Sequence, residues 1–519
     1  MTETTSTATA SPTESERIAD FALNLQLADV PADVLALAKE HLLDVIGIAL
    51  ASSRFDIGES VLEGARALGH GNDATAIGSG TRLPAASAAL VNGVLAHALD
   101  FDDTHIGAIY HASAQAMAAV MAAGQANGSS GQEVLLSFVA ALEIGCRLAT
   151  VGAPDFHNRG FHPTALCGTF AAAAAAGRLY GSTPQALVSA LGLCGSQASG
   201  ILIGGISWLK RLHPGWSAHS ALAAVSLARA GFLGPSTVFE AGKGGFYQTH
   251  IQRTPTAEQL PSLGLGSEWL SRGIALKPYP CCHFIHAFVD AALELRGQFD
   301  LAEVERIDCP LTPDLHKMVA EPREACIRPS IPYRALFSVQ YVVALALARG
   351  KVDLAAFHDE PLDSPAVLQV AAKTFCVPDP ASDFPRRFPG EVVVHLKDGR
   401  VLRCRKPASL GTPDVPLSTQ ALQANAHGEC NACHLRDRSP AAHAGRAAAP
   451  GGCVAGPGHG AVHVGGSVML RRRSFAMALG AAPLAALPLR ANAAGSYPER
   501  PVTILVGFRQ ARPPTSAPA

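Results

Sequence analysis

The sequence predicts a mainly α-helical fold, in which a large all-helical domain precedes a smaller α+β domain. Apolar residues recur three and four positions apart through about residues 16–269, which is the spacing of helices packed on one face. Short alternating runs replace this spacing over about residues 270–405. With 48% hydrophobic and only 16% charged residues, the composition excludes an intrinsically disordered protein.

The first domain, residues 16–269, is expected to consist of successive helices. Pro31 stands in the first turn of a run that keeps helical spacing as far as Gly47. Glycine, asparagine, serine and proline residues separate this run from the next ones. Further helices are expected at residues 84–98, 112–123, 131–150, 164–180, 184–194 and 218–230.

The second domain, residues 270–405, mixes strands and helices. A strand is expected from Val304 to Cys309, and the Asp398-Gly399 pair between two alternating runs predicts a β-hairpin. Helices are expected at residues 285–298 and 338–348. This combination is typical of a small α+β domain.

The two ends of the chain carry no periodic apolar pattern. Residues 1–15 and 406–519 are predicted to be unfolded, the latter being low in complexity. Residues 469–494 have the basic start, apolar stretch and Ala-Asn-Ala end of a bacterial export signal, and the residues after them resemble the mature start of periplasmic tricarboxylate-binding receptors. We hypothesise that the reading frame shifts near residue 408 into a neighbouring gene. A genuine low-complexity tail is the alternative, and sequencing the locus distinguishes the two.

Overall charge and cysteine content narrow the class of partner. The 41 basic and 42 acidic residues leave a net charge of −1, so nothing indicates a nucleic-acid partner, whereas a small anionic substrate stays open. Twelve cysteines are too sparse for a disulfide scaffold, and no uninterrupted apolar run is long enough to span a membrane. We therefore expect a soluble cytoplasmic protein without a membrane partner.

The densest polar cluster runs from His97 to His105 and is followed by His111. If it is helical, His97, Asp100 and Thr104 share one face because they are spaced three and four apart. Burying so many polar groups is costly without a purpose. A solvated helix end capped by aspartates is the alternative. The cluster matches no standard zinc or calcium spacing, so no metal is predicted.

Two further clusters place histidines and cations before predicted helices. Pro163 fits the first turn of a helix, which leaves His162 at an N-terminus suited to an anion or to proton transfer. Lys210, Arg211 and His213 together make a candidate carboxylate pocket ahead of the helix expected at 218–230.

A fourth cluster lies near the predicted domain junction, where clefts often form. It contains Lys277, the adjacent cysteines that end at Cys282, and His283. Taken alone, this cluster and the one around Lys210 are also compatible with solvated loops. The motif from Cys430 to His434 matches c-type haem attachment, but it stands in the predicted unfolded tail, so no haem is expected.

Taken together and in order, these motifs resemble the MmgE/PrpD family, which includes 2-methylcitrate dehydratase and cis-aconitate decarboxylase. The resemblance covers about residues 16–405. It rests on His97-Ala-Leu-Asp-Phe-Asp-Asp-Thr104, Gly160-Phe-His-Pro-Thr164, Lys210-Arg-Leu-His-Pro-Gly215, Gly231-Phe-Leu-Gly-Pro235, Lys277-Pro-Tyr-Pro280 and Phe337-Ser-Val-Gln-Tyr341.

The resemblance implies a helical domain, an α+β lid domain, and a homodimer with the active site between the domains. It also implies chemistry without a metal or an organic cofactor. Residues that it places at the site are Asp100, Thr104, His111, His162, Lys210 and Lys277, with Tyr341 as a further candidate and His213, Cys282 and His283 as substrate contacts.

Two positions depart from the family pattern. The chain has His111-Ala-Ser113 where many relatives have His-Pro-Ser. Decarboxylases of the family carry a catalytic histidine five positions after the lysine of the fourth cluster, and an ungapped match places Cys282 there. His283 takes that place only after a local shift.

The predicted activity is the elimination of water from a hydroxy-polycarboxylate such as 2-methylcitrate. Lys210 and Lys277 are assigned to carboxylate binding, His162 and Asp100 to proton transfer, and Thr104 and His111 to orienting the substrate or the leaving group. Decarboxylation, isomerisation or epimerisation of a related di- or tricarboxylate stays open. A non-catalytic carboxylate-binding protein is the alternative from another class.

Overall fold

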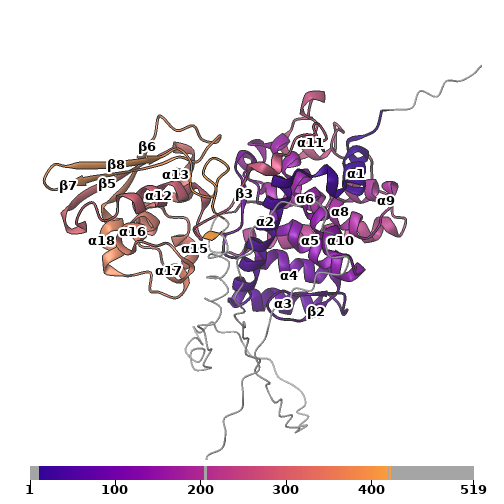
Figure 1. Ribbon diagram of the computed structural model, residues 1–519, viewed down its shortest axis with the longest axis horizontal. Coiled ribbons are helices and arrows are strands. Elements are labelled where there is room, and N and C mark those ends of the chain that lie inside the picture. The colour runs from indigo at the N-terminus through magenta and orange to yellow at the C-terminus, as the bar shows by residue number, and fades with distance from the viewer. Residues whose placement is uncertain (1–10, 204–206, 419, 422–519) are drawn as a thin grey trace, which may run out of the picture. The chain divides into compact units, whose positions relative to one another are not determined.

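Helices make up nearly all of the first part of the chain. The structure is a computed structural model that describes residues 11–203, 207–418 and 420–421. These residues belong to one compact unit. Figure 1 shows these helices from indigo to magenta, coloured by residue number along the chain. They are α1 (Glu14–Asn24), α2 (Ala32–Ser52), α3 (Asp56–Ala67), α4 (Ala85–His97), α5 (Ser113–Asn127), α6 (Gly131–Gly152), α7 (Asp155–Asn158), α8 (Pro163–Leu179), α9 (Pro184–Cys194), α10 (Leu209–Arg229) and α11 (Phe246–Ile251).

Six of the seven helices expected in this part lie near the expected residues, whereas α10 begins earlier than expected and α1, α3, α7 and α11 were not predicted. The sequence analysis placed this helix at residues 218–230 and left a loop open for the cluster around Lys210, but α10 begins at Leu209 and contains Pro214. Pro214 is the sixth residue of α10 and has no N–H to donate to the Lys210 carbonyl, so the helix continues through it with one backbone hydrogen bond fewer. Lys210 therefore lies in the first turn of a helix and not in a loop.

The first part is not entirely helical, which corrects the sequence prediction. Strands β1 (Ala74–Thr75) and β2 (Arg82–Leu83) pair antiparallel. Strand β3 (Thr104–His105) pairs with β4 (Ile274–Ala275), which the sequence analysis had assigned to the second domain. Two-residue strands carry too little alternation to be recognised from sequence. The β3–β4 pair joins the polar cluster after α4 to the segment that leads into Lys277.

Two glycines let α4 and α10 approach closely. A Cβ atom on Gly93 would lie 2.6 Å from the Cα atom of Gly215, and one on Gly215 would lie 2.3 Å from the carbonyl oxygen of Leu90. Side chains at either position would force the two helices apart. Their close crossing positions the end of α4 beside the start of α10, where the site residues Asp100 and Lys210 form an ion pair.

We expect Gly215→Ala to destabilise the protein by about 1–3 kcal/mol, because the added methyl group meets the α4 backbone, which has little freedom to move. Gly64→Ala is the matched control. A Cβ atom on Gly64 meets nothing within 4 Å, so alanine in that helix should raise stability by about 0.5–1 kcal/mol. Urea unfolding of both variants measures the difference, and equal stability would contradict the close crossing.

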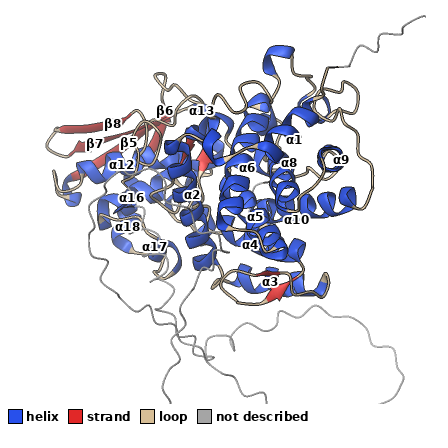
Figure 2. Cartoon of the chain, turned by 45° about the vertical axis from the view of Figure 1, so that its right-hand side comes forward, coloured by secondary structure: helices blue, strands red, loops and turns tan. Residues whose placement is uncertain are grey.

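The second part is an α+β arrangement, as predicted. Figure 2 shows that most strand residues lie in this part. Its longer elements are α12 (His286–Leu295), β5 (Val304–Leu311), α16 (Val339–Arg349), α18 (Pro365–Lys373), β6 (Thr374–Pro378), β7 (Gly390–Leu396) and β8 (Val401–Lys406). Its short helices are α13 (Pro313–Val319), α14 (Arg323–Ile327), α15 (Pro332–Ala335) and α17 (Leu354–His358).

Four strands form the sheet of this part in the order β6-β5-β7-β8. Strand β5 pairs parallel with β6 and antiparallel with β7. Strands β7 and β8 form the hairpin that Asp398-Gly399 predicted, with His395 opposite Val401. Gly399 has a φ of +86°, a left-handed conformation that glycine adopts without strain.

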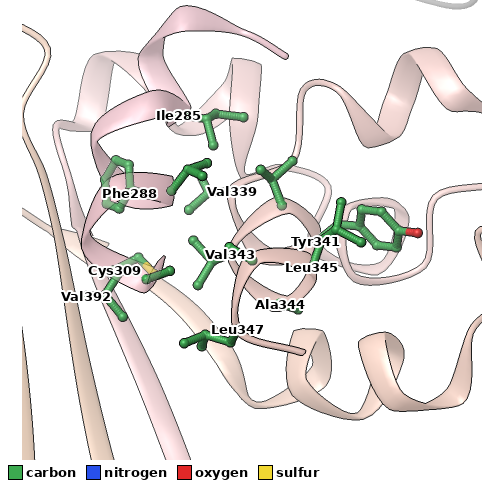
Figure 3. Close-up of a cluster of buried hydrophobic side chains, with 14 of the residues drawn as sticks. Ile285, Phe288, Cys309, Val339, Tyr341, Val343, Ala344, Leu345, Leu347 and Val392 are labelled. Atoms are coloured by element: carbon green, nitrogen blue, oxygen red, sulfur yellow. The ribbon is translucent and has the colours of Figure 1, made fainter. Parts of the chain in front are cut away.

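Helices α12, α16 and α18 lie along the sheet and bury its apolar face (Figure 1). Figure 3 shows Phe288 of α12 and Val343 of α16 meeting Val392 of β7 in this core. Tyr341 belongs to the same buried cluster and is 1% exposed. The regularly spaced apolar residues of these helices therefore pack against the sheet.

The folded chain continues past the boundary predicted at residue 405. Strand β8 ends at Lys406, Leu410 donates a backbone hydrogen bond to Asp290, and the Gly411 carbonyl accepts one from Leu276. Ser409 and Thr412 are buried. The unfolded tail was therefore predicted to begin too early. Residues 406–412 are held by backbone hydrogen bonds, which leave no periodic apolar pattern in the sequence. The export-signal-like segment at 469–494 and the haem-like motif lie outside the described residues.

Helix α6 is the one described helix that is long and apolar enough to cross a membrane. However, 83% of its apolar window is buried inside the protein. The helices of the first part pack around it, which is what a core helix of a folded domain requires.

Candidate active site

The polar cluster after α4 is a turn and not a continued helix. Helix α4 ends at His97, and Asp100 adopts a left-handed conformation with a φ of +53°. Aspartate tolerates this region better than most residues. The shared helical face that the spacing of His97, Asp100 and Thr104 suggested is therefore wrong. The turn sends Asp100 and Thr104 to the cavity described below and directs Asp102 inward.

Asp102 links two histidines in the buried interior. Its carboxylate lies 2.8 and 2.9 Å from Nδ1 of His97, and 3.2 Å from Nδ1 of His111. All three side chains are less than 9% exposed. Burial alone would raise the pKa of Asp102, but the two imidazoles hold it well below its usual value. The ionised carboxylate thus orients both rings through their Nδ1 atoms.

Asp103 fixes the same turn from the other side. Nδ1 of His41 lies 2.5 Å from its carboxylate, and the Ser113 backbone donates to it at 3.1 Å. The Ser113 hydroxyl also donates to Asp103. These bonds tie the turn to α2 and to the start of α5, so the positions of Asp102 and His111 are set by buried contacts.

His162 caps the N-terminus of α8, as the following proline predicted. Its backbone N–H donates to Gly200 at 3.0 Å, and its Nδ1 lies 2.9 Å from Nδ1 of His213. In the first turn of the same helix, the Thr164 hydroxyl accepts a 3.0 Å hydrogen bond from the His111 backbone. The α8 N-terminus therefore holds both His162 and His111 in place.

Two lysines converge on Asp100. Lys210 forms an ion pair with its carboxylate, and Lys277 donates to its backbone carbonyl at 2.6 Å and lies 3.6 Å from the carboxylate. Burial would raise the pKa of Asp100, but the two positive charges lower it below its usual value. Burial alone would lower the pKa of the Lys210 ammonium group, but the negative charge of Asp100 raises that pKa above its usual value. Asp100 and Lys210 are therefore both charged.

Three histidines around the site, His97, His162 and His213, are neutral at pH 7. Burial lowers the pKa of His97 to about 4. Burial, aided by the charge of Lys210, lowers the pKa of His162 well below its usual value and that of His213 to about 4. A neutral imidazole can accept a proton, so His162 is suited to act as a base.

One cavity of about 640 Å³ collects these groups. Side chains from both parts of the chain line it. The first part contributes Asp100, Thr104, Ile109, His111, His157, His162, Leu202, Ile203, Ser207 and Lys210, and the second contributes Lys277, Cys282, His283, Phe284, Asp314, Lys317, Met318, Ala325, Ser330, Ile331, Tyr333, Arg334, Phe337 and Phe388.

Eight of the ten site residues proposed from sequence line this cavity. They are Asp100, Thr104, His111, His162, Lys210, Lys277, Cys282 and His283. His213 is not among the lining residues and instead contacts His162 from behind. The Thr104 hydroxyl and both ring nitrogens of His283 are buried and have no hydrogen-bond partner in the described chain. These groups are free to bind a ligand.

Tyr341 is the residue that the structure separates from the site. It lies in the buried core of the second part and does not line the cavity. Figure 3 shows it on α16 among aliphatic side chains. Tyr341 belongs to one of the motifs that carry the family resemblance. The sequence alone did not show whether its side chain packs in the core or contacts a substrate.

We expect Tyr341→Phe to leave kcat/KM within about twofold, because it removes only the hydroxyl group of a residue that does not line the cavity. Tyr341→Ala should instead destabilise the protein by about 3–5 kcal/mol, as other large core truncations do. Steady-state kinetics and urea unfolding separate the two effects. A large loss of kcat in Tyr341→Phe with unchanged stability would return Tyr341 to the site.

Sequence reasoning missed several lining residues of the second part. Lys317 of α13, and Tyr333 and Arg334 of α15, face the cavity. These helices are only 7 and 4 residues long, which is too short for helical spacing to appear. The pair Tyr333-Arg334 directly precedes the Phe337–Tyr341 motif, and that proximity was the one available indication.

Buried neutral histidines make stability depend on pH. His97, His105 and His213 have folded-state pKa values of about 4, whereas an unfolded histidine titrates near 6.5. Between these values the unfolded chain binds more protons, so the free energy of unfolding falls as pH falls from about 6.5 to 4. Each group contributes up to about 1.4 kcal/mol per pH unit in that window.

We therefore expect the Tm to fall steeply between pH 7 and pH 5. His105→Gln tests the cause because His105 is buried but does not line the cavity. The variant should show a smaller change of Tm over the same pH interval, measured by calorimetry at a fixed scan rate. An equal change in wild type and variant would show that His105 is not a source of the effect.

Family models match most of the chain. Residues 16–259 match the MmgE/PrpD N-terminal domain, and residues 279–430 match the MmgE/PrpD C-terminal domain. The second match extends past residue 408, the point near which a change of reading frame was hypothesised. That hypothesis stays untested.

Curated relatives agree with the family models. Cis-aconitate decarboxylase of Aspergillus terreus is 29% identical over 395 residues, which are 72% of this chain and 80% of the relative. Cis-aconitate decarboxylase-like protein oryM of Aspergillus oryzae is 30% identical over 74% of this chain and 84% of its own length. 2-Methylcitrate dehydratase of Cupriavidus necator is 28% identical over 190 residues, 34% of this chain and 37% of the relative.

Proposed function

Because the chain belongs to the MmgE/PrpD family, whose members include a decarboxylase and a dehydratase, we propose that it is a lyase acting on a di- or tricarboxylate. The reaction that we favour is the elimination of water from a hydroxy-tricarboxylate such as 2-methylcitrate. One observation carries this proposal. Lys210, Lys277, His111 and His162 are among the residues that line a single cavity, and such groups can hold carboxylates and move protons beside them.

Carboxylate binding is the role of Lys210 and Lys277. Both ammonium groups contact Asp100 in the free protein, and a substrate carboxylate can take up their remaining hydrogen-bond donors. Asp100 holds the two lysines together and offsets one of their positive charges. Since those lysines lower its pKa, Asp100 is a weak base. We therefore assign it to positioning the lysines rather than to proton transfer.

Proton removal falls to His162. The neutral ring takes the proton from the carbon next to a bound carboxylate, and the C–H electron pair becomes the new C=C bond. Negative charge that develops on that carboxylate in the transition state faces Lys210 or Lys277 and the N-terminus of α8. These fixed charges require no rearrangement during the reaction.

Departure of the hydroxyl group requires an acid, which we assign to His111. Its Nδ1 faces Asp102 at 3.2 Å, so its other nitrogen is the one available to the substrate. His111 donates a proton as the C–O bond breaks, and water leaves. The unpartnered Thr104 hydroxyl orients the leaving group. The substrate proton stays on His162 and the hydroxyl group leaves as water with the proton from His111, so the return of one proton from His162 to His111 completes the cycle.

Decarboxylation of cis-aconitate is the second candidate, and similarity over most of the chain favours it. The decarboxylases align with more than 70% of this chain, whereas the dehydratase aligns with 34%. In that reaction the C–C bond to a carboxylate breaks, CO₂ leaves, and an acid protonates the carbanion. At Cys282, burial raises the thiol pKa to about 12. The Cys282 thiol therefore keeps its proton and is the available donor, whereas burial lowers the pKa of His283 beside it well below its usual value and leaves that ring neutral.

A substrate panel separates these reactions. The purified full-length chain is incubated with 2-methylcitrate, citrate and cis-aconitate, and ultraviolet absorbance and CO₂ release are followed. We expect a new conjugated double bond from 2-methylcitrate without CO₂. Release of CO₂ from cis-aconitate would replace the first candidate with the second. Binding of the acids by calorimetry without any turnover would favour a carboxylate-binding protein and contradict both.

A further inference from the structure

Three buried histidines at the cavity stand close enough to share one metal ion. One ring nitrogen from each of His97, His111 and His162 lies within 4.8 Å of those of the other two. Ring centroids are 4.5 Å apart for His97 and His111, and 5.7 and 5.8 Å apart for the pairs with His162. A tetrahedral zinc ion with ligands at about 2.0–2.1 Å holds them about 3.3 Å apart, so small side-chain rotations close the site.

The Nδ1 atom of each ring lies near another polar group. Nδ1 of His97 and of His111 faces the Asp102 carboxylate, and Nδ1 of His162 faces His213. This leaves Nε2 of each ring for an ion. Nε2 of His97 is buried and has no hydrogen-bond partner among the described residues. Histidine ligands oriented by a carboxylate at the other nitrogen are a general feature of zinc sites.

Charge in the surroundings is compatible with a divalent ion. The Asp102 carboxylate directly behind two of the rings offsets part of its charge. Lys210 and Lys277 also lie at the cavity, but both contact the Asp100 carboxylate. Three imidazoles without a protein carboxylate in the first shell select Zn²⁺, Cu²⁺ or Ni²⁺ over Mg²⁺ or Ca²⁺.

We propose that His97, His111 and His162 form a binding site for a divalent transition-metal ion, and that occupation of this site inhibits the enzyme. An ion held by the Nε2 atoms withdraws His111 and His162 from proton transfer. Inhibition should be competitive with substrate and reversed by a chelator. The inhibitory effect rests on the proposed function, whereas metal binding does not.

Metal stoichiometry tests the site directly on the full-length chain. The protein is treated with chelator, dialysed, and equilibrated with Zn²⁺, and bound zinc is measured by atomic absorption. Co²⁺ serves as a second probe because its visible absorption reports four-coordinate ligation. His97→Gln and His111→Gln each remove one proposed ligand. His283→Ala is the matched control, since it removes another buried histidine of the same cavity.

We expect wild type and His283→Ala to bind one more equivalent of Zn²⁺ than His97→Gln and His111→Gln. The motif around Cys430 and Cys433 is present in all four proteins, so any ion held there cancels in the difference. The Co²⁺ absorption should be lost with the same two variants. If His97→Gln fails to fold, His111→Gln decides alone, because its backbone contact with Thr164 is retained.

Equal zinc binding by wild type and His111→Gln would overturn the proposal, as would a loss in His283→Ala alone. These outcomes are read from bound metal. A chain that binds zinc as expected but turns over no substrate would leave the site standing and contradict the proposed function instead. If the chain turned over substrate but its zinc binding did not depend on these histidines, the proposed function would stand and the metal site would be contradicted.

Discussion

Lys210→Met is expected to lower kcat/KM about 10³-fold. The ammonium group of Lys210 binds a substrate carboxylate and stabilises the charge that forms on it in the transition state, and loss of a single preorganised donor at such a position costs about 10²–10³-fold. Removal of the cation also leaves the Asp100 carboxylate with Lys277 as its remaining partner. Both kcat and KM should therefore change, in contrast to a purely binding residue.

The control for this substitution is Lys351→Met. Lys351 pairs with Asp353 at the surface and does not line the cavity, so its loss should leave kcat/KM within about twofold. Circular dichroism and the Tm show whether each variant is folded. A folded Lys210→Met protein with nearly wild-type kcat/KM would remove Lys210 from the mechanism and would weaken the assignment of the cavity.

His162→Ala is expected to lower kcat by about 10²–10⁴-fold, which is the usual contribution of a positioned general base. The change removes the ring that faces the cavity at the start of α8 and leaves the other residues of the site in place. Exchange of the substrate proton with D₂O, followed by NMR, isolates the step in which this residue acts. The exchange rate should fall together with kcat.

His219→Ala is the matched control for His162→Ala. His219 stacks on Trp216 and contacts the Ala86 carbonyl, away from the lining of the cavity. Its substitution should change neither turnover nor exchange. If His162→Ala retained proton exchange but lost product formation, His162 would be the acid, and the roles of His162 and His111 would be reversed.

The fold was predictable where apolar residues keep one regular spacing over many positions. The helix at 184–194 was expected at the residues where α9 lies, and the hairpin around Asp398-Gly399 has the expected turn. Helix α10 was predicted to begin at residue 218, whereas it begins at Leu209 and contains Pro214. Strands β3 and β4 could not be predicted, because each gains its stability from a partner about 170 residues away.

The candidate site was predictable to the extent that it consists of dense polar motifs. His162 and Lys277 were identified because charged or titratable residues beside proline stand out from apolar surroundings. Asp102 was part of the first cluster, yet its role as a shared partner of His97 and His111 depends on the turn at Asp100. Local sequence carries little information on such a turn. Tyr341 belongs to a motif of the family resemblance, but its side chain lies in the core cluster of the second part and not in the lining of the cavity.

The most direct test of the account is the fate of 2-methylcitrate in the presence of the full-length chain in D₂O. ¹H NMR follows the substrate and any olefinic product. We expect formation of a tricarboxylate with a new C=C bond, release of water without CO₂, and loss of this reaction in Lys210→Met and His162→Ala. An unchanged spectrum for 2-methylcitrate, citrate and cis-aconitate alike, with folded protein, would contradict the assignment of the cavity as a lyase active site.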